Sequence, residues 1–339
     1  ESFSEASYTG GMKSFALILM LMLFLTACQS SIGREDSLAS SKTDQSRTQP
    51  NSTETITKAS TATSTPTPSA PATPTAPPAT TSTLSPMSIP GYNTLYIGHS
   101  FGKPFADRLT DFAENSEIDG HSQDVAGRGG FEGSPQALWN NEETKLEIQG
   151  ILDSGDIDLL IMICCSNDLL ETGSDWGVTN WIDYALSKNP NTKFALALPW
   201  LTSPQEKYAN AAEYGNTWHN LHEKIWHALI DELKKRYPEI EIFCIPHGRA
   251  ATELRSQFEA GTLDDVDAMI SNDGNGIFRD SIGHADRILV DLGTLVWLKS
   301  IYDVDLSVYP VGHLGNTIAQ YQIDLRRIAE AIVDEERNW

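Results

Sequence analysis

From about residue 90 onward, the hydrophobic positions follow two alternating patterns. Short apolar or β-branched runs predict five strands, near residues 94–97, 123–126, 159–164, 194–198 and 240–245. The third run, Leu159 to Cys164, is apolar throughout, which is typical of a strand covered on both faces. Between the runs, apolar residues such as Phe105, Leu109 and Phe112 recur at helical spacing. This alternation predicts an α/β fold, with a five-stranded parallel sheet and helices on both faces.

The later helices are also predicted from spacing. They cover about 135–152, a stripe running from Tyr214 to Leu233, part of 250–283, and the segments 288–301 and 317–335. On the long helix, His219, Glu223 and His227 recur every four residues, which is a possible metal-binding face. Because the apolar stripe lies on other positions, we interpret this face as solvated. No local Cys/His spacing indicates zinc, so we predict neither a metal nor a cofactor.

The first ninety residues have a different character. Met12-Lys13 and the apolar run 15–25 are too short to span a bilayer and predict a signal peptide. The run ends in Leu25-Thr26-Ala27-Cys28, which resembles the lipobox of bacterial lipoproteins. The resemblance implies that Cys28 is lipidated and, with Gln29 after it, that the protein is anchored at the outer membrane or cell surface of the bacterial envelope. An ordinary cleaved secretory signal is the alternative. Residues 1–11 are interpreted as a tag remnant or an over-extended start.

Composition divides the remainder of the chain. Residues 29–89 are rich in Ser, Thr and Pro and predict a disordered linker, because they offer little apolar surface to bury. Residues 90–339 then form one domain of ordinary size. The formal net charge of −22 argues against nucleic acid as a partner and against electrostatic binding to an anionic membrane. We therefore expect membrane contact only through the N-terminal lipid.

A candidate nucleophile follows the first predicted strand. Ser100 lies on a turn between Gly98 and Gly102, and Pro104 suits the first turn of a helix. A serine near a helix N-terminus is favourably placed for nucleophilic attack, although a capped strand–helix junction has the same residues. Its base is predicted to be His284, in a polar loop that also holds Asp280 to orient the imidazole.

Donors for a developing oxyanion are also present. They are the backbone N–H groups of Ser100 and of Gly130 or Gly129, and the side-chain amide of Asn167. These residues follow the carboxyl ends of predicted strands, where ligands bind in parallel sheets. We therefore expect the separate segments to meet at one edge of the sheet.

In order along the chain, Gly98-x-Ser100, a glycine loop, the run 165–168, Asp280 and His284 resemble the blocks of the SGNH, GDSL-like hydrolases. The resemblance covers roughly residues 93–303. It implies a three-layer flavodoxin-like fold, with the nucleophile, oxyanion donors and base assigned as above.

Three positions depart from the family pattern. Cys165 occupies a position that is usually glycine, and His99 precedes the serine in place of aspartate. Asp280 lies four residues before His284 instead of three, so a Ser–His dyad supported by a backbone carbonyl is the alternative. The run 98–102 also matches the G-x-S-x-G elbow of α/β-hydrolases, but only a few ordered residues precede it, whereas that fold needs several strands there.

These observations predict a serine esterase, with deacetylation of a carbohydrate as the expected activity. Trp139, Trp200, His99 and Asp168 are candidate substrate contacts, because they lie near loops at the expected active edge and aromatic rings can stack on sugars. For the tryptophans, packing in the core or at the rim of the site is the alternative. Two alternatives use the same site, namely lipase or short-chain acyl esterase activity and acyl transfer to a glycan. A third is a catalytically silent surface binding module of the same shape.

Overall fold

The computed structural model describes residues 89–163, 177–310 and 318–339, all of which belong to one compact unit. The predicted signal peptide, Cys28 and the linker lie outside these residues. So do Asn167 and Asp168. The predictions made for those positions therefore stay predictions.

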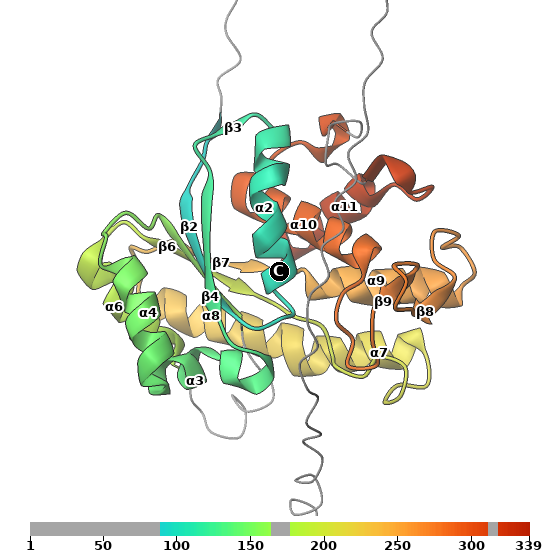
Figure 1. Cartoon of the computed structure of the whole chain (residues 1–339), viewed down its shortest axis with the longest axis horizontal. Helices are drawn as coiled ribbons and strands as arrows, with labels where there is room; N and C mark the ends of the chain where they lie inside the picture. The colour runs from blue at the N-terminus through green and yellow to red at the C-terminus, as the bar shows by residue number, and fades with distance from the viewer. Residues whose placement is uncertain (1–88, 164–176, 311–317) are drawn as a thin grey trace, which may run out of the picture. The chain divides into compact units, whose positions relative to one another are not determined.

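The central sheet has the predicted five strands. They are β2 (Asn93–Gly98), β4 (Ser122–Gly127), β5 (Leu159–Ile163), β6 (Lys193–Ala197) and β7 (Ile242–Ile245). All neighbours pair in parallel, in the spatial order β4-β2-β5-β6-β7 (Figure 1). Numbered along the chain, this order is 2-1-3-4-5, the flavodoxin-like arrangement, which confirms the predicted fold. The order reverses beside β2, so the turn after β2 lies at the topological switch point.

Nine α-helices are described. They are α2 (Lys103–Asn115), α3 (Pro135–Asn140), α4 (Glu142–Leu152), α6 (Val178–Lys188), α7 (Ala211–Trp218), α8 (Lys224–Arg236), α9 (Gly248–Glu259), α10 (Arg287–Tyr302) and α11 (Leu325–Arg337). None of the helices in the described ranges combines the length and the hydropathy that a bilayer span requires. Two small parallel sheets pair β1 (Ile89–Pro90) with β3 (Ile118–Asp119) and β8 (Ala268–Ile270) with β9 (Gly276–Phe278).

The helices form layers on the two faces of the sheet (Figure 1). On one face, α2 packs closely against α10, and α11 packs against α10 in turn. Gly293 allows this approach, because a methyl group there would lie 2.4 Å from the ring of Phe105. On the other side of the sheet, the group α3, α4 and α6 is held partly by the indole N–H of Trp181, which donates to the carbonyl of Pro135 at 2.9 Å.

Several element boundaries differ from the sequence prediction. The helix predicted over 135–152 breaks at Asn141, whose side chain accepts from the backbone N–H of Thr144 and caps α4. The last helix begins at Leu325 instead of residue 317, because Asp324 caps it. The strands β1, β3, β8 and β9 were not predicted, since runs of two or three residues carry no periodic signal.

The long helix predicted through Tyr214 to Leu233 is interrupted by a π-helical turn, His219–Glu223, between α7 and α8. A π turn holds an extra residue and therefore rotates the helix face that follows it. As a result, Glu223 and His227 are only 1% and 5% exposed, and the prediction of a solvated face is wrong. Glu223 instead accepts from Arg249 Nε at 2.7 Å and also contacts His219, which makes it part of a buried ion-pair network.

Candidate active site

Ser100 lies in the tight turn that joins β2 to α2. The carbonyl of His99 accepts hydrogen bonds from the backbone N–H groups of Gly102 at 3.1 Å and Lys103 at 3.2 Å. It also accepts from the hydroxyl of Tyr96 at 2.7 Å. The Tyr96 side chain therefore lies under the turn, and a methyl group on Gly102 would come within 2.4 Å of its hydroxyl oxygen. This close approach explains why the residue two positions after Ser100 is a glycine, Gly102.

The structure brings together the three residues that the sequence proposed as nucleophile, base and orienting acid. Ser100 Oγ lies 2.9 Å from Nε2 of His284, 184 positions away in the chain. Nδ1 of the same imidazole lies 2.7 Å from Oδ2 of Asp280. With the proton on Nδ1, the ring donates to the carboxylate and accepts from the serine hydroxyl, as a general base must.

The loop that carries Asp280 and His284 is closed by its own backbone. Arg279 N–H donates to the carbonyl of His284 at 2.9 Å, and Phe278 bridges to Ala285. Gly283 has φ of +100°, a conformation that favours glycine. The turn allows the second carboxylate oxygen of Asp280 to accept from the N–H groups of Gly283 and His284 at 3.0 and 3.1 Å. A four-residue spacing thus still places the carboxylate against the imidazole.

The charge state of Asp280 suits this arrangement. Partial burial acts to raise its pKa, but the hydrogen bonds from the backbone N–H and imidazole of His284 and from the N–H of Gly283 outweigh it, so the pKa lies below its ordinary value. The group is therefore a carboxylate at neutral pH. A carboxylate in this position fixes the tautomer of the imidazole and stabilises its protonated form.

The glycine loop after β4 lies against the Ser100 turn. It forms a short 3₁₀ turn, Gly130–Gly133, and a methyl group on Gly133 would lie 2.6 Å from Cβ of His99. Gly130 has φ of +55°, and neither it nor Gly129 has any neighbouring atom that would block a side chain. Within the described residues, the N–H groups of Ser100 and Gly130 donate to no protein acceptor. They are therefore available to an oxyanion, while Asn167, the third proposed donor, lies outside the described residues.

Ser100 and His284 open onto a cavity of about 740 Å³. Its wall is mostly apolar and is completed by Gly129, Gly130, Phe131, Trp200, Leu201, Tyr208, Leu221, His222 and Ile282, among others. Phe131 and Ile282 are 57% and 54% exposed, unusual values for large apolar side chains. The cavity suits an apolar group placed next to the serine hydroxyl.

Only some of the candidate substrate contacts line the cavity. Trp200 lines the cavity but is only 1% exposed, because its ring stacks on Phe101 with centroids 4.6 Å apart. Trp139 does not line the cavity at all, and its ring packs edge-on against Trp181. Neither tryptophan is therefore placed to stack on a sugar beside Ser100, and packing, the alternative, describes both rings. His99 does line the cavity, and Asp168 lies outside the described residues.

Sequence reasoning missed several wall residues, including Tyr208, Leu221 and His222. His222 was not singled out because the π turn, which the sequence did not predict, brings it to the cavity. Its Nδ1 is buried without a hydrogen-bond partner in the described structure. A sequence signal for these contacts does not exist, since their positions depend on how α7 and α8 meet the Ser100 turn.

Trp200 positions the catalytic loop instead. Its indole N–H donates to the carbonyl of Gly283 at 2.8 Å, and its ring supports Phe101, which contacts the His284 ring edge-on.

We expect Trp200→Phe to reduce the free energy of unfolding by about 1–3 kcal/mol, because a buried carbonyl loses its donor. It should also lower kcat several-fold. Chemical denaturation and steady-state kinetics test this, with Trp139→Phe as the matched control. Equal effects in both variants would contradict the assigned role.

Two buried histidines, His247 and His222, and the half-buried His99 give the fold a pH dependence. Burial lowers the pKa of His247 and of His222 to about 3 and that of His99 to about 4; for His222 and His99 a neighbouring imidazole adds to this. In the unfolded chain, each of these histidines has a pKa of about 6.5. Their stabilising contribution is therefore full above about pH 6.5 and is lost as pH falls toward 4, at about 1.4 kcal/mol per pH unit for each group.

Urea unfolding at about pH 7, 6 and 5 tests this expectation. The free energy of unfolding should fall across the series, and more steeply in the wild type than in His247→Gln. His247 is fully buried, and its Nε2 lies 3.1 Å from the carbonyl of Phe101. The same slope in both proteins would show that His247 does not contribute.

No family model matches the chain, and no curated protein matches it. Similar solved structures include a DUF4886 family protein from Bacteroides uniformis, with TM-score 0.46 and 16% identity over 74% of this chain and 96% of that one. A family 3 carbohydrate esterase from Clostridium thermocellum has TM-score 0.39 and 14% identity, over 65% of this chain and 100% of that chain. A candidate SGNH hydrolase from Slackia heliotrinireducens has TM-score 0.40 and 13% identity, over 63% of this chain and 99% of that chain.

The sheet order and the contacts of the site are properties of this chain itself. A 2-1-3-4-5 parallel sheet carries Ser100 after its first strand, a glycine loop after its second, and His284 with Asp280 in the loop after β9. This fold and this order of residues agree with what the sequence resemblance to the SGNH, GDSL-like hydrolases implied.

Proposed function

We propose that this protein is a serine esterase that hydrolyses carboxylic esters through an acyl-serine intermediate. The observation that carries the proposal is the unbroken hydrogen-bonded series from Ser100 through His284 to Asp280, which opens onto a cavity. Such a series activates a serine hydroxyl that is otherwise a weak nucleophile.

The proposed reaction has two stages, acylation of Ser100 and hydrolysis of the acyl-serine. Ser100 Oγ attacks the ester carbonyl while Nε2 of His284 takes its proton, and Asp280 stabilises the imidazolium that forms. The carbonyl oxygen becomes an oxyanion within reach of the N–H groups of Ser100 and Gly130, with Asn167 as a proposed third donor. His284 then returns the proton to the departing alcohol. A water molecule, deprotonated by the same imidazole, attacks the acyl-serine. His284 then returns that proton to Ser100 Oγ as the acid is released.

For the substrate, we propose an acylated carbohydrate from which the enzyme removes acetyl groups. The tryptophans no longer support this choice, because Trp139 lies elsewhere and Trp200 is buried. The apolar wall around Ser100, with Phe131 and Ile282 exposed at the surface, favours a second candidate, an ester with a longer acyl chain. The two differ in the acyl group that the cavity must hold.

A series of p-nitrophenyl esters separates the candidates, with acetylated xylan assayed in parallel for released acetate. A deacetylase should cleave the acetate ester best and release acetate from xylan. A longer-chain esterase should show kcat/KM rising from acetate to butyrate and octanoate, with little action on xylan. Failure to cleave any of these esters would contradict the esterase proposal and favour a silent binding module or an acyltransferase.

We also propose that the protein is held in the bacterial envelope by a lipid on Cys28. The support is the sequence alone, in which the lipobox-like run 25–28 is followed by a linker long enough to extend the domain from a membrane. Growth with labelled palmitate should label the wild type and not Cys28→Ala. Equal labelling of the two proteins would reject lipidation at this residue.

A further inference from the structure

A second group of reactive side chains lies beside the edge strand β7, apart from the Ser100 cavity. It consists of His227 on α8, Cys244 on β7 and Glu336 on α11, which we call the β7-edge cluster. One ligand atom from each lies within 4.8 Å of the others. The cluster joins three elements that are distant in sequence, and none of its members lines the Ser100 cavity.

The cluster is largely shielded from solvent. Cys244 is 9% exposed, and the side chains of His227 and Glu336 are 6% and 11% exposed. His227 Nε2 lies 2.7 Å from Oε1 of Glu336, while Trp339 packs against the His227 ring with centroids 4.1 Å apart. A carboxyl group is rarely left in such surroundings unless something compensates its burial.

The polar atoms of the cluster are not all satisfied. Glu336 Oε2 and His227 Nδ1 are buried with no hydrogen-bond partner in the described structure, and the hydroxyl of Ser300 on the same cavity wall is in the same state. Arg337, which also lines this cavity, pairs with Asp303 instead of with Glu336. Unpartnered buried atoms of this kind indicate a missing ligand, either a cation or an ordered water.

The combination of donors favours one cation. Imidazole, thiolate and carboxylate together are ligands for Zn²⁺, which they hold at about 2.0–2.3 Å in tetrahedral geometry. Ligands around such an ion are about 3.3–3.8 Å apart, so the spacing within the cluster needs only small side-chain movements. A thiolate and a carboxylate also balance the two positive charges. A cavity of about 450 Å³, lined in part by all three residues, gives access and room for a water as fourth ligand.

We propose that the β7-edge cluster binds one Zn²⁺ through His227, Cys244 and Glu336. Binding replaces the thiol proton of Cys244, which is released to solvent, and forms one bond to each residue. The ion links α8, β7 and α11, and it therefore ties the C-terminal helix to the edge of the sheet. The site lies outside the serine cavity, so the ion takes no part in the proposed ester hydrolysis.

The test uses the full chain, freed of metal with a chelator. Titration with ZnCl₂ in a calorimeter should give one site, and Zn²⁺ should raise Tm because it binds the folded state. Titration with Co²⁺ should give visible bands of a tetrahedral site and a thiolate-to-metal charge-transfer band. Cys244→Ser should abolish that band and weaken Zn²⁺ binding by more than about 100-fold, since loss of an outer-shell partner alone costs about 10- to 100-fold.

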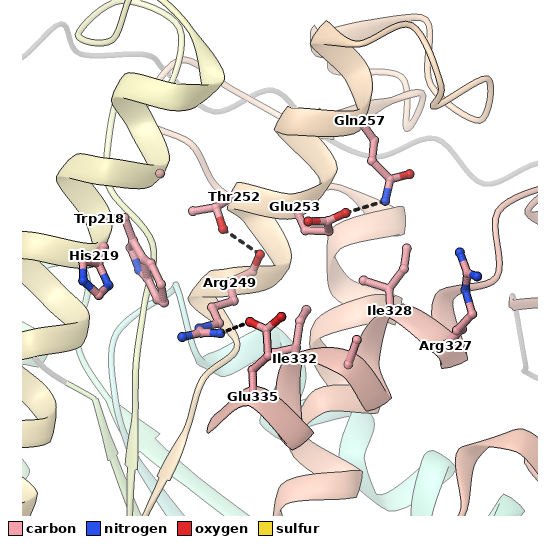
Figure 2. Close-up of a pocket in the computed structure, with 12 residues that line it drawn as sticks. Trp218, His219, Arg249, Thr252, Glu253, Gln257, Arg327, Ile328, Ile332 and Glu335 are labelled. Carbon is pink, nitrogen blue, oxygen red and sulfur yellow. Dashed lines mark hydrogen bonds and ion pairs between the residues drawn. The ribbon is translucent and has the colours of Figure 1, made fainter. Parts of the chain in front are cut away.

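Glu336→Gln should also weaken binding, while Glu335→Gln is the matched control. Glu335 precedes Glu336 on α11 but points across to Arg249 on α9, as Figure 2 shows. Circular dichroism of the metal-free variants shows whether they fold, so a loss of binding is not confused with unfolding. No stoichiometric Zn²⁺ binding would overturn the proposal and indicate a buried water instead. Binding that persists in Cys244→Ser, or is weakened equally in Glu335→Gln, would overturn it as well.

Discussion

Replacing Ser100 with alanine is expected to lower kcat for ester hydrolysis by roughly 10⁵-fold or more, the order found when a nucleophilic serine is removed from a triad. The reason is specific to the geometry. Ser100 Oγ lies 2.9 Å from the base nitrogen of His284, and among the described residues no other hydroxyl forms a hydrogen bond with that nitrogen. Steady-state kinetics with a p-nitrophenyl ester measures the loss.

The matched control for this variant is Ser116→Ala. The hydroxyl of Ser116 donates to the carbonyl of Phe112 at the far end of α2 and does not reach the cavity. The control should keep wild-type kcat. Both variants should unfold at nearly the wild-type denaturant concentration, because Ser100 is a half-buried turn residue whose loss leaves no cavity in the core. Substantial residual turnover in Ser100→Ala would mean that another residue is the nucleophile.

Asp280→Asn is expected to lower kcat by about 10³- to 10⁴-fold with little change in KM, as amide replacement does in other triads. An asparagine can present its N–H₂ group to Nδ1 of His284, which then holds the proton on Nε2, facing the serine. In that tautomer the imidazole cannot accept the serine proton. Because Asp280 also accepts two backbone N–H groups, the loop should keep its shape.

Asp273→Asn serves as the control for this change. Asp273 lies in an exposed turn shortly before the same loop, bonds to Ser271, and makes no contact with His284. Its replacement should leave kcat unchanged. If kcat of Asp280→Asn stayed within about threefold of the wild-type value, the Ser–His dyad supported by a backbone carbonyl would be the better description.

Much of the fold and of the site could be predicted because the informative residues are local. The central strands of the sheet are mostly apolar runs, whereas the edge strand β4 is largely polar and gives a weaker signal. The residues of the triad lie in short blocks at strand or loop ends. The parallel topology then brings Ser100 and His284 together, although 184 positions separate them. Even the irregular spacing of Asp280 is absorbed by a turn at Gly283, a residue visible in the sequence.

The failures share a physical cause. The π turn at 219–223 is a local irregularity with no periodic signature, and it reverses the expected exposure of Glu223 and His227. Trp139 and Trp200 were proposed as substrate contacts because they lie near loops in the sequence, but in the structure their rings pack against other aromatic rings. The β7-edge cluster could not be predicted at all, since its members come from α8, β7 and α11 and meet only in the folded chain.

The most direct test of the central claim is covalent labelling of the wild-type protein with a fluorophosphonate, followed by mass mapping of the peptides. A fluorophosphonate reacts with a serine hydroxyl only when a neighbouring base activates it. The account predicts one adduct per chain, on Ser100, and none in His284→Ala. No adduct in the wild type, or an adduct on a different serine, would contradict it.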